Sequence, residues 1–272
     1  MDYKINYITP DIKLSCYEGK PFKTDALFED HLLVWLLSGE TRLIMADATY
    51  GFQANQIFLI PRHQLATVIN STVTGQPHRS VAMHLTTAGL REFYRETEPR
   101  TAPVSDGRIR RFDGHPLLKS FLASLLPYFE IRDPFPETIA ALKIREAISI
   151  LRIIDPDIDG LLTSFADPGK IHLAEFMEKN YMFNMPLKKF GYLTGRSVST
   201  FNRDFKKIYQ TTPQKWLTQK RLALAYYQLA EEKKRPVDVY LEVGFEDLSH
   251  FSSAFKKQYG YAPTALAQKK PQ

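Results

Sequence analysis

The pattern of apolar and polar positions changes twice along the chain. From residue 3 to about residue 86, apolar or alternating runs of five to seven residues are separated by turn-forming residues, which predicts short β-strands. Strands at this spacing are typical of a barrel or a sandwich. The predicted strands cover residues 3–7, 31–37, 41–45, 56–60, 64–69 and 80–85, with turn signals at Ser38-Gly39, Tyr50-Gly51 and Thr74-Gly75.

The period then lengthens to that of a helix. Two apolar helices at the end of a β domain can cap its core or pair with a second copy of the chain, so capping and a homodimer through residues 115–154 both stay open. The first stripe, ended by Asp133-Pro134, consists of Leu117, Leu118, Phe121, Leu122, Leu125, Leu126 and Phe129. The second, ended by Asp155-Pro156, consists of Ile139, Leu142, Ile144, Ile148 and Leu151.

Acidic, proline and glycine residues gather over 155–160 and 166–169, which predicts a linker. We therefore divide the chain into a β-rich regulatory and dimerisation domain over residues 1–156, a linker over 157–169, and a helical domain over 170–272. A helix over 171–181 is expected to begin that helical domain.

One stretch of the helical domain occurs twice. SVSTFNRDFKKIYQTTP begins at Ser197, and DLSHFSSAFKKQYGYAP begins fifty residues later at Asp247. In each copy two Phe four residues apart and a Tyr four further on share one helical face, while a Lys pair and small polar residues take the other. Each copy therefore predicts an amphipathic helix with a basic, solvent-facing side.

A short apolar segment and a glycine precede each of these helices. Phe190 is followed five positions later by Gly195, and Val239 by Gly244. A short helix, a glycine that can adopt positive φ, and a second helix make a helix-turn-helix, so the sequence predicts two in tandem. Pro213, with Thr212 as N-cap, is expected to start the helix that joins them.

At these residues the chain resembles the AraC family of bacterial transcription regulators. The stretch VYLEVGFEDLSHFSSAFKKQYGYAP over 239–263 resembles the family signature, and Arg221-x-x-x-Ala225 matches the helix joining its two motifs. The resemblance covers roughly residues 170–265. It implies a DNA-binding transcription regulator, more often an activator, with double-stranded DNA and RNA polymerase as partners. The segment over 54–61 is similar to a strand-then-proline element of cupin-like domains.

Charge and composition agree with this interpretation. Residues 168–272 carry 18 basic and 9 acidic residues, a net charge of +9, whereas the first 167 carry −3. A polyanion partner is therefore expected for the C-terminal domain only. The single Cys16 cannot form an internal disulfide, and the sequence shows neither a charged-then-apolar leader nor a run of about eighteen apolar residues, so we expect a cytoplasmic protein with no membrane partner.

The solvent-facing sides of the two predicted recognition helices supply the candidate DNA contacts. Arg203 can bind guanine through two hydrogen bonds and Asn202 can bind adenine, whereas Lys206 suits a phosphate. The second helix has no Arg or Asn at the matching positions, so we expect it to add affinity more than specificity. The candidates are Ser199, Thr200, Asn202, Arg203 and Lys206 on the first helix, and Ser249, His250, Ser252, Ser253 and Lys256 on the second.

The strand region offers little chemistry. His31, His63, His78 and His84 include no H-x-H pair and no Glu at ligand spacing, so we expect isolated histidines, no metal site and no cofactor. No phosphate loop, nucleophile elbow or Cys/His constellation appears, and an enzyme is not expected.

The expected class is α+β: a β-rich, cupin-like barrel with a helical appendage, then an all-α domain with two helix-turn-helix motifs. The expected function is sequence-specific DNA binding for transcription activation, through two successive major grooves. The alternative is a ligand-sensing cupin-like module whose small-molecule occupancy controls DNA binding. A small-molecule or protein effector at the N-terminal domain is accordingly a candidate partner. An apolar pocket inside the barrel favours ligand control, whereas a filled barrel favours protein partners or constitutive action.

Overall fold

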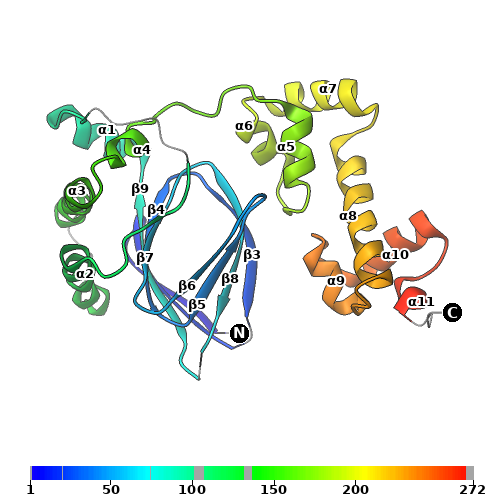
Figure 1. Ribbon diagram of the computed structural model, residues 1–272, viewed down its shortest axis with the longest axis horizontal. Helices are drawn as coiled ribbons and strands as arrows, with labels where there is room; N and C mark the ends of the chain where they lie inside the picture. The colour runs from blue at the N-terminus through cyan, green and yellow to red at the C-terminus, as the bar shows by residue number, and fades with distance from the viewer. Residues whose placement is uncertain (1, 20, 74, 101–106, 132–136, 268–272) are drawn as a thin grey trace. The chain divides into compact units, whose positions relative to one another are not determined.

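The chain folds as two compact units, residues 1–167 and residues 168–272 (Figure 1). The first is β-rich with a helical layer, and the second is all-α. This confirms the α+β class, with the β-rich part first and the tandem helical part second. The computed structural model describes residues 2–19, 21–73, 75–100, 107–131 and 137–267.

Two antiparallel sheets face each other in the N-terminal unit, as in a flattened barrel. The larger has the strand order β1 (Asp2–Thr9), β2 (Ile12–Glu18), β9 (His78–Leu85), β4 (His31–Ser38), β7 (Ile57–Ile60) and β10 (Arg110–Arg111). The smaller has the order β3 (Phe22–Phe28), β8 (Gln64–Ser71), β5 (Glu40–Ile44) and β6 (Thr49–Gln53).

The central strand β4 shows why its sequence is apolar without alternation. Leu33 and Trp35 belong to the core between the larger sheet and the helices, whereas Leu32, Val34 and Leu36 belong to the core between the two sheets. Both faces of the strand are therefore buried, which removes any need for polar residues.

Large apolar side chains of the barrel's own strands pack in the space between the sheets. Phe52 and Phe58 stack there with their ring centroids 3.6 Å apart, and both are 1% exposed. Leu36, Leu43 and Ile60 are buried around them. An apolar pocket inside the barrel was expected to favour ligand control. The side-chain packing found there instead favours protein partners or constitutive action over a ligand inside the barrel.

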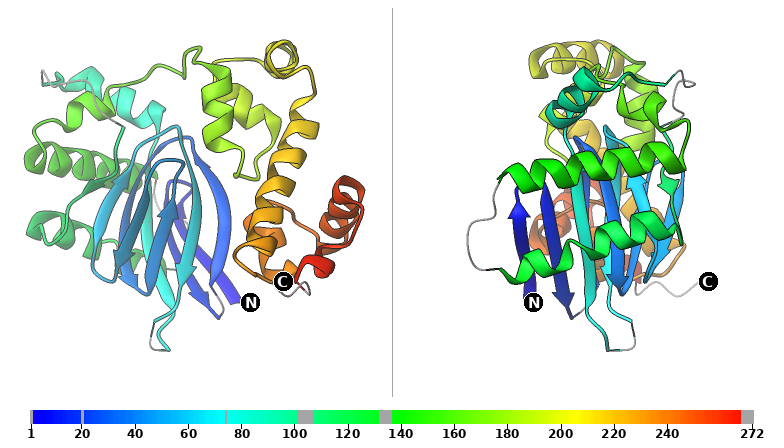
Figure 2. Two further views of the ribbon diagram at one scale, coloured as in Figure 1. Left: turned by 45° about the vertical axis from the view of Figure 1, so that its right-hand side comes forward. Right: turned by 90° about the vertical axis from the view of Figure 1, so that its left-hand side faces the viewer.

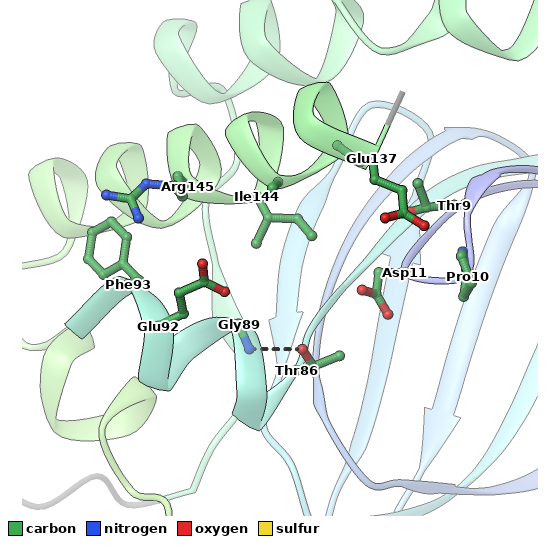
Figure 3. A pocket seen from close by; sticks show the side chains of 12 residues that line it. Thr9, Pro10, Asp11, Thr86, Gly89, Glu92, Phe93, Glu137, Ile144 and Arg145 are labelled. Carbon is green, nitrogen blue, oxygen red and sulfur yellow. Dashed lines mark hydrogen bonds between the residues drawn. The ribbon is translucent and has the colours of Figure 1, made fainter. Parts of the chain in front are cut away.

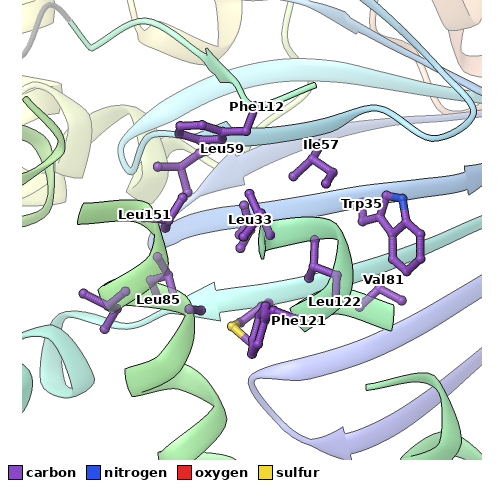
Figure 4. Packing of buried hydrophobic residues seen from close by; sticks show 14 of the residues in the cluster. Leu33, Trp35, Ile57, Leu59, Val81, Leu85, Phe112, Phe121, Leu122 and Leu151 are labelled. Atoms are coloured by element: carbon purple, nitrogen blue, oxygen red, sulfur yellow. The ribbon is translucent and has the colours of Figure 1, made fainter. Parts of the chain in front are cut away.

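Helices cover the outer face of the larger sheet (Figure 2). Figure 4 shows Leu33, Ile57 and Val81 of the sheet among Phe121, Leu122 and Leu151 of the helices. The layer comprises α1 (Thr87–Glu96), α2 (Pro116–Ala123), the 3-10 turn η1 (Leu126–Glu130), α3 (Glu137–Ile154) and α4 (Ile158–Leu162).

The first apolar stripe forms two segments instead of the single helix expected. α2 ends at Ala123, because Pro127 has no N–H to donate to the Ala123 carbonyl, and η1 follows. Most of the stripe is used in the core: Leu118 and Leu122 are 0% exposed. The expected stop at Asp133-Pro134 lies outside the described residues.

The predicted linker over 157–169 begins too early. Within that range α4 buries Ile158, Leu161 and Leu162 in the core of the N-terminal unit. Asp159, 1% exposed, accepts hydrogen bonds from Arg152 and from the Tyr94 hydroxyl at 2.6 Å. The Asp-Pro and Asp-Gly signals were interpreted as a linker because sequence alone does not show that this acidic turn docks on an arginine.

Several other elements differ from the sequence prediction. Gly39, at φ +82°, lies in the tight turn between β4 and β5, but Gly51 lies inside β6 and not in a turn. Thr74 lies outside the described residues, and Gly75 adopts φ +76°. β2, β3, β6, β10 and α1 were not predicted.

The C-terminal unit consists of helices. α6 and α7 form the first helix-turn-helix and α9 and α10 the second, and α8 joins them after its Thr212 N-cap, as the sequence predicted. Among the described residues, no helix has the length and apolarity to cross a membrane. The helices are α5 (Leu173–Asn180), α6 (Leu187–Leu193), α7 (Val198–Tyr209), α8 (Pro213–Ala230), α9 (Pro236–Glu242), α10 (Leu248–Tyr259) and α11 (Pro263–Ala267).

Candidate nucleic-acid interface

The first recognition helix, α7, has capped ends and an aromatic inner face. The Ser197 hydroxyl accepts a hydrogen bond from the Thr200 N–H at 3.2 Å, and Gln210 ends the helix in the left-handed conformation at φ +54°. Phe201 and Phe205 are 0% exposed, and the Phe205 ring lies 5.5 Å from the ring of Trp216 on α8. This packing determines which side of α7 remains in solvent.

The first set of candidate contacts lies on that solvent-facing side. Ser199, Arg203 and Lys206 are exposed, while Thr200 and Asn202 are half-buried. The hydroxyls of Ser199 and Thr200 each lie 3.0 Å from the Ser197 hydroxyl, so both take part in the cap. The structure thus brings the five residues together on one helix, with two of them engaged in capping.

A charged network that the sequence reasoning missed stands behind Arg203. Asp204 accepts a hydrogen bond from Arg196 Nε at 3.1 Å, and its other oxygen lies 3.5 Å from Arg203 Nε. The hydrogen bond from Arg196, with the nearby positive charge of Arg203, holds the pKa of the Asp204 carboxyl below its usual range. The Arg203 side chain stays 64% exposed. In the sequence this network was signalled by Asp204, a single acidic residue on an otherwise basic helix.

The second recognition helix, α10, repeats this architecture with different caps. The Asp247 carboxylate accepts from the His250 N–H at 2.7 Å, and Gly260 closes the helix at φ +85°. Phe251 and Phe255 are 0% exposed. Both motifs therefore use the same aromatic pair to hold the helix against α8.

The second set of candidate contacts also lies on the solvent-facing side. Ser249, His250, Ser253 and Lys256 are exposed, and Ser252 is half-buried. The His250 ring lies 5.6 Å from the ring of Phe245 in the turn before the helix. This face has hydroxyls, one imidazole and one ammonium, but no guanidinium and no amide.

The N-terminal unit has a cavity of about 350 Å³ outside the barrel, between the β1–β2 turn, α1 and α3 (Figure 3). Its apolar lining includes Phe93 and Ile144. Three carboxylates border it, those of Asp11, Glu92 and Glu137, together with the guanidinium of Arg145, which pairs with Glu96 at 2.6 Å. Burial raises the pKa of the Asp11 carboxyl, partly offset by the nearby His84.

Two histidines of the strand region, His31 and His78, are buried, and each has one ring nitrogen within hydrogen-bond distance of a neighbour. The Arg62 N–H donates to His31 Nδ1 at 3.2 Å, and the Thr41 hydroxyl lies 2.8 Å from His78 Nε2. Burial lowers the pKa of His31 to about 3 and that of His78 to about 4. In the described part of the chain, no three His, Cys, Asp or Glu side chains form a group that could hold a metal ion.

Comparison with known proteins matches both units. Residues 193–269 match a family described as "Helix-turn-helix domain", and residues 31–155 match one described as "ExsA N-terminal regulatory domain". The regulator ExsA of Pseudomonas aeruginosa is 25% identical over 265 residues, covering 94% of this chain and 92% of ExsA. This chain belongs to the AraC family of transcription regulators.

Other AraC-family relatives align over less of their length. The virulence regulon transcriptional activator VirF of Yersinia enterocolitica is 28% identical over 155 residues, 56% of this chain and 57% of VirF. The chain thus spans just over half the length of that relative. Among solved structures, an apo form of ToxT from Vibrio cholerae aligns with 95% of this chain at 10% identity and a TM-score of 0.46.

Proposed function

We propose that this AraC-family chain is a sequence-specific DNA-binding transcription activator. The supporting observation is that two helix-turn-helix motifs pack on one helix, α8, and each exposes a polar side with lysines in its last turn. An α-helix fits the major groove of B-DNA, and successive grooves on one face lie about 34 Å apart. Two recognition helices joined by one rigid helix suit two such grooves.

In this proposal the two helices have different tasks. Arg203 reads guanine and Asn202 reads adenine, while Lys206 contacts a phosphate. On α10, Ser249, His250, Ser252, Ser253 and Lys256 contact phosphates or bases through water, which discriminates bases weakly. The first motif supplies most of the specificity and the second mostly adds affinity.

Activation, with RNA polymerase as the protein partner, belongs to the same proposal. Its support is the similarity to VirF, a virulence regulon transcriptional activator. Reporter expression from a bound promoter, with and without the chain, tests the sign of regulation. Reduced expression in the presence of the chain would make it a repressor.

DNA binding is tested by titrating the full chain on native promoter fragments and on random duplexes at several salt concentrations. We expect binding to weaken steeply with salt, because each neutralised phosphate adds about 0.9 to the slope of log K against log salt. Residues 168–272 alone should retain the salt dependence. A folded chain that binds no promoter more tightly than random DNA would overturn the proposal.

A second candidate function is sensing of a small molecule by the N-terminal unit. The cavity outside the barrel supports it: about 350 Å³ lies within the usual range for ligand sites, and an apolar lining with carboxylates suits an amine with an apolar body. Thermal unfolding of the full chain with a panel of small amines tests this. Ala141→Trp, at the cavity lining, should abolish the stabilisation, and Ser149→Trp, exposed on the same helix, should preserve it. A panel in which no amine raises the unfolding temperature would remove this candidate.

We also propose a homodimer through residues 115–154, with a contact surface smaller than the two full apolar stripes expected from the sequence. Most residues of both stripes lie in the core of the unit or pack against it, but Leu142 stays 63% exposed and Leu117 49% exposed. We expect Leu142→Glu to reduce the sedimentation coefficient at tens of micromolar. Leu118 and Leu122 cannot serve for this test, since both are fully buried. A wild-type chain that sediments as a monomer would discard the dimer.

A further inference from the structure

The joining helix α8 has a buried arginine that contacts both helix-turn-helix halves. The Arg221 residue is 8% exposed. Its Nη2 donates to the Phe183 carbonyl at 2.9 Å, and its Nη1 donates to the Asn184 side-chain oxygen at 3.1 Å and to the Gly244 carbonyl at 3.0 Å. Phe183 and Asn184 lie in the loop between α5 and α6, beside the first motif, whereas Gly244 lies in the turn of the second.

Two further features hold this loop against that turn. The Asn184 amide donates to Glu246 Oε1 at 2.8 Å. Gly244 has φ +88°, and a Cβ at that position would lie 3.0 Å from Arg221 Nε and 3.3 Å from the Met182 carbonyl. A glycine is therefore required both for the backbone conformation and for the close approach.

The contacts of Arg221 lie at the point along α8 between the part that packs with the first motif and the part that packs with the second. Trp216 and Leu217 are buried on the N-terminal side of Arg221, and Trp216 contacts the aromatic rings of the first motif. Leu222, Ala225 and Leu229 pack with the second motif. Each motif thus packs on its own part of α8, so these apolar contacts do not join the two motifs directly to each other. The Arg221 bridge between loop and turn does join them.

We propose that Arg221 is a positioning residue that fixes the angle between the two recognition helices, so that the chain accepts DNA half-sites at one spacing. The planar guanidinium suits this role because it directs several donors at fixed angles, and here it meets oxygens from both halves at once. A lysine ammonium at this position has three donors on one atom and cannot span the same oxygens. The inference rests on the proposed DNA-binding function.

The DNA consequence is a dependence on helical phase. Inserting three base pairs between half-sites rotates one against the other by roughly 100° and moves them about 10 Å apart. Two recognition helices at a fixed angle can then no longer bind both half-sites at once, so we expect the affinity of the wild-type chain for DNA to fall on the order of a hundredfold. A chain whose recognition helices can rotate against each other should lose less affinity on insertion. It should bind DNA with the original spacing more weakly than wild type.

The first experiment measures spacing tolerance. The full chain selects its site from a random duplex pool, and three base pairs are then inserted between the two protected half-sites. Arg221→Met keeps the apolar stem but removes the donors, and it should reduce the insertion penalty to about tenfold or less. Lys220→Met is the matched control, because Lys220 pairs with Glu178 on α5 and lies over the rings of Tyr181 and Trp216, all on the side of the first motif. The same insertion penalty in wild type and Arg221→Met would overturn the inference.

A second variant keeps the test decisive if Arg221→Met fails to fold. Glu246 is exposed, so Glu246→Ala removes its hydrogen bond with Asn184 and leaves the buried arginine intact. Like Arg221→Met, it should reduce the insertion penalty, but by a smaller factor. An unchanged penalty in Glu246→Ala, where Arg221→Met is unfolded, would count against the inference.

A DNA-free measurement separates this inference from the proposed function. Spin labels at Lys207→Cys and Lys257→Cys, equivalent exposed positions on α7 and α10, report the distance between the helices in a Cys16→Ser background. The distribution should be narrow with Arg221 present and broader in Arg221→Met. Equal widths would overturn the inference even if DNA binding is demonstrated. Failure of the selection to enrich any site would instead overturn the proposed function, and the distance widths would still decide the role of Arg221.

Discussion

The two helix-turn-helix motifs have the same inner face and different outer faces. The ring centroids of Phe201 and Phe205 are 5.9 Å apart in the first motif, and those of Phe251 and Phe255 are 5.7 Å apart in the second. Each helix begins with a side-chain cap and ends at a residue with positive φ. The interior of a protein is close-packed, so the buried face admits few substitutions. The solvent-facing side is not restrained in this way, and there the copies differ.

The largest difference concerns the charged network of the first motif. Arg196, Arg203 and Asp204 stand fifty residues before Glu246, Ser253 and Ala254. The second motif therefore lacks the guanidinium proposed to read a base and the carboxylate beside it. At the position of Arg196 it has a glutamate, which bonds to Asn184. The same backbone plan thus carries the proposed base-reading surface in one copy and a structural contact in the other.

The shared inner face predicts equal and large stability effects. Phe205→Ala and Phe255→Ala should each reduce the free energy of unfolding of the C-terminal unit by about 3–5 kcal/mol, because each removes a fully buried ring and leaves a cavity. Urea unfolding followed by circular dichroism measures both. Ile208→Ala is the control, since Ile208 is 48% exposed and its truncation should cost under about 0.5 kcal/mol. A loss in only one of the two motifs would show that their packing is not equivalent.

The different outer faces predict unequal effects on DNA affinity. Arg203→Ala should cost about 1–3 kcal/mol on the selected site and little on random DNA, because it removes the donors proposed to read guanine. Ser253→Ala, at the matching position of α10, should cost less than about 0.5 kcal/mol on either DNA, as is usual for exposed positions. Equilibrium titrations of both variants on both duplexes give these values.

Two outcomes would contradict that distinction. Equal losses for Arg203→Ala on specific and random DNA would reduce Arg203 to a phosphate contact. A larger loss for Ser253→Ala than for Arg203→Ala would transfer the specificity to the second motif.

The caps provide a smaller test, within the helices themselves. Ser197→Ala and Asp247→Ala should each destabilise the C-terminal unit by about 1 kcal/mol, since each leaves a first-turn N–H without its side-chain acceptor. Ser197→Asp should restore the wild-type value, because aspartate caps α10 at the matching position. Thermal unfolding of the three variants checks this, and an alanine without effect would mean that water replaces the cap.

The comparison also indicates how far the sequence predicts the structure. The tandem motifs, the Thr212 cap and the apolar strand β4 were predicted because periodicity and capping are local signals. β6, with Gly51 inside it, was missed since a strand that contains glycine gives the same local signal as a turn.

The missed features of the site depend on distant partners. Arg196 lies eight residues from Asp204, and Arg221 lies 37 residues from Asn184. The docking of α4 likewise needs Arg152 and Tyr94 to compensate the buried Asp159. A local pattern can mark one member of such a pair, as the single acidic Asp204 does on α7, but it does not show the partner, because the pair forms only when the packing brings the two segments together.

The smallest predicted effect concerns the lysines at matching positions on the two recognition helices. Lys206 and Lys256 are both exposed in the last turn of α7 and α10, and the proposal assigns each to one phosphate. Lys206→Ala and Lys256→Ala should each lower the slope of log K against log salt by about 0.9 and weaken specific and random binding alike. The double variant should lower the slope by about twice as much, since the two contacts are independent. Titration at four or more salt concentrations measures the slopes. A reduced slope for Lys206→Ala with an unchanged slope for Lys256→Ala would mean that α10 stays away from the DNA backbone, and the second motif would then contribute no phosphate contact through this lysine.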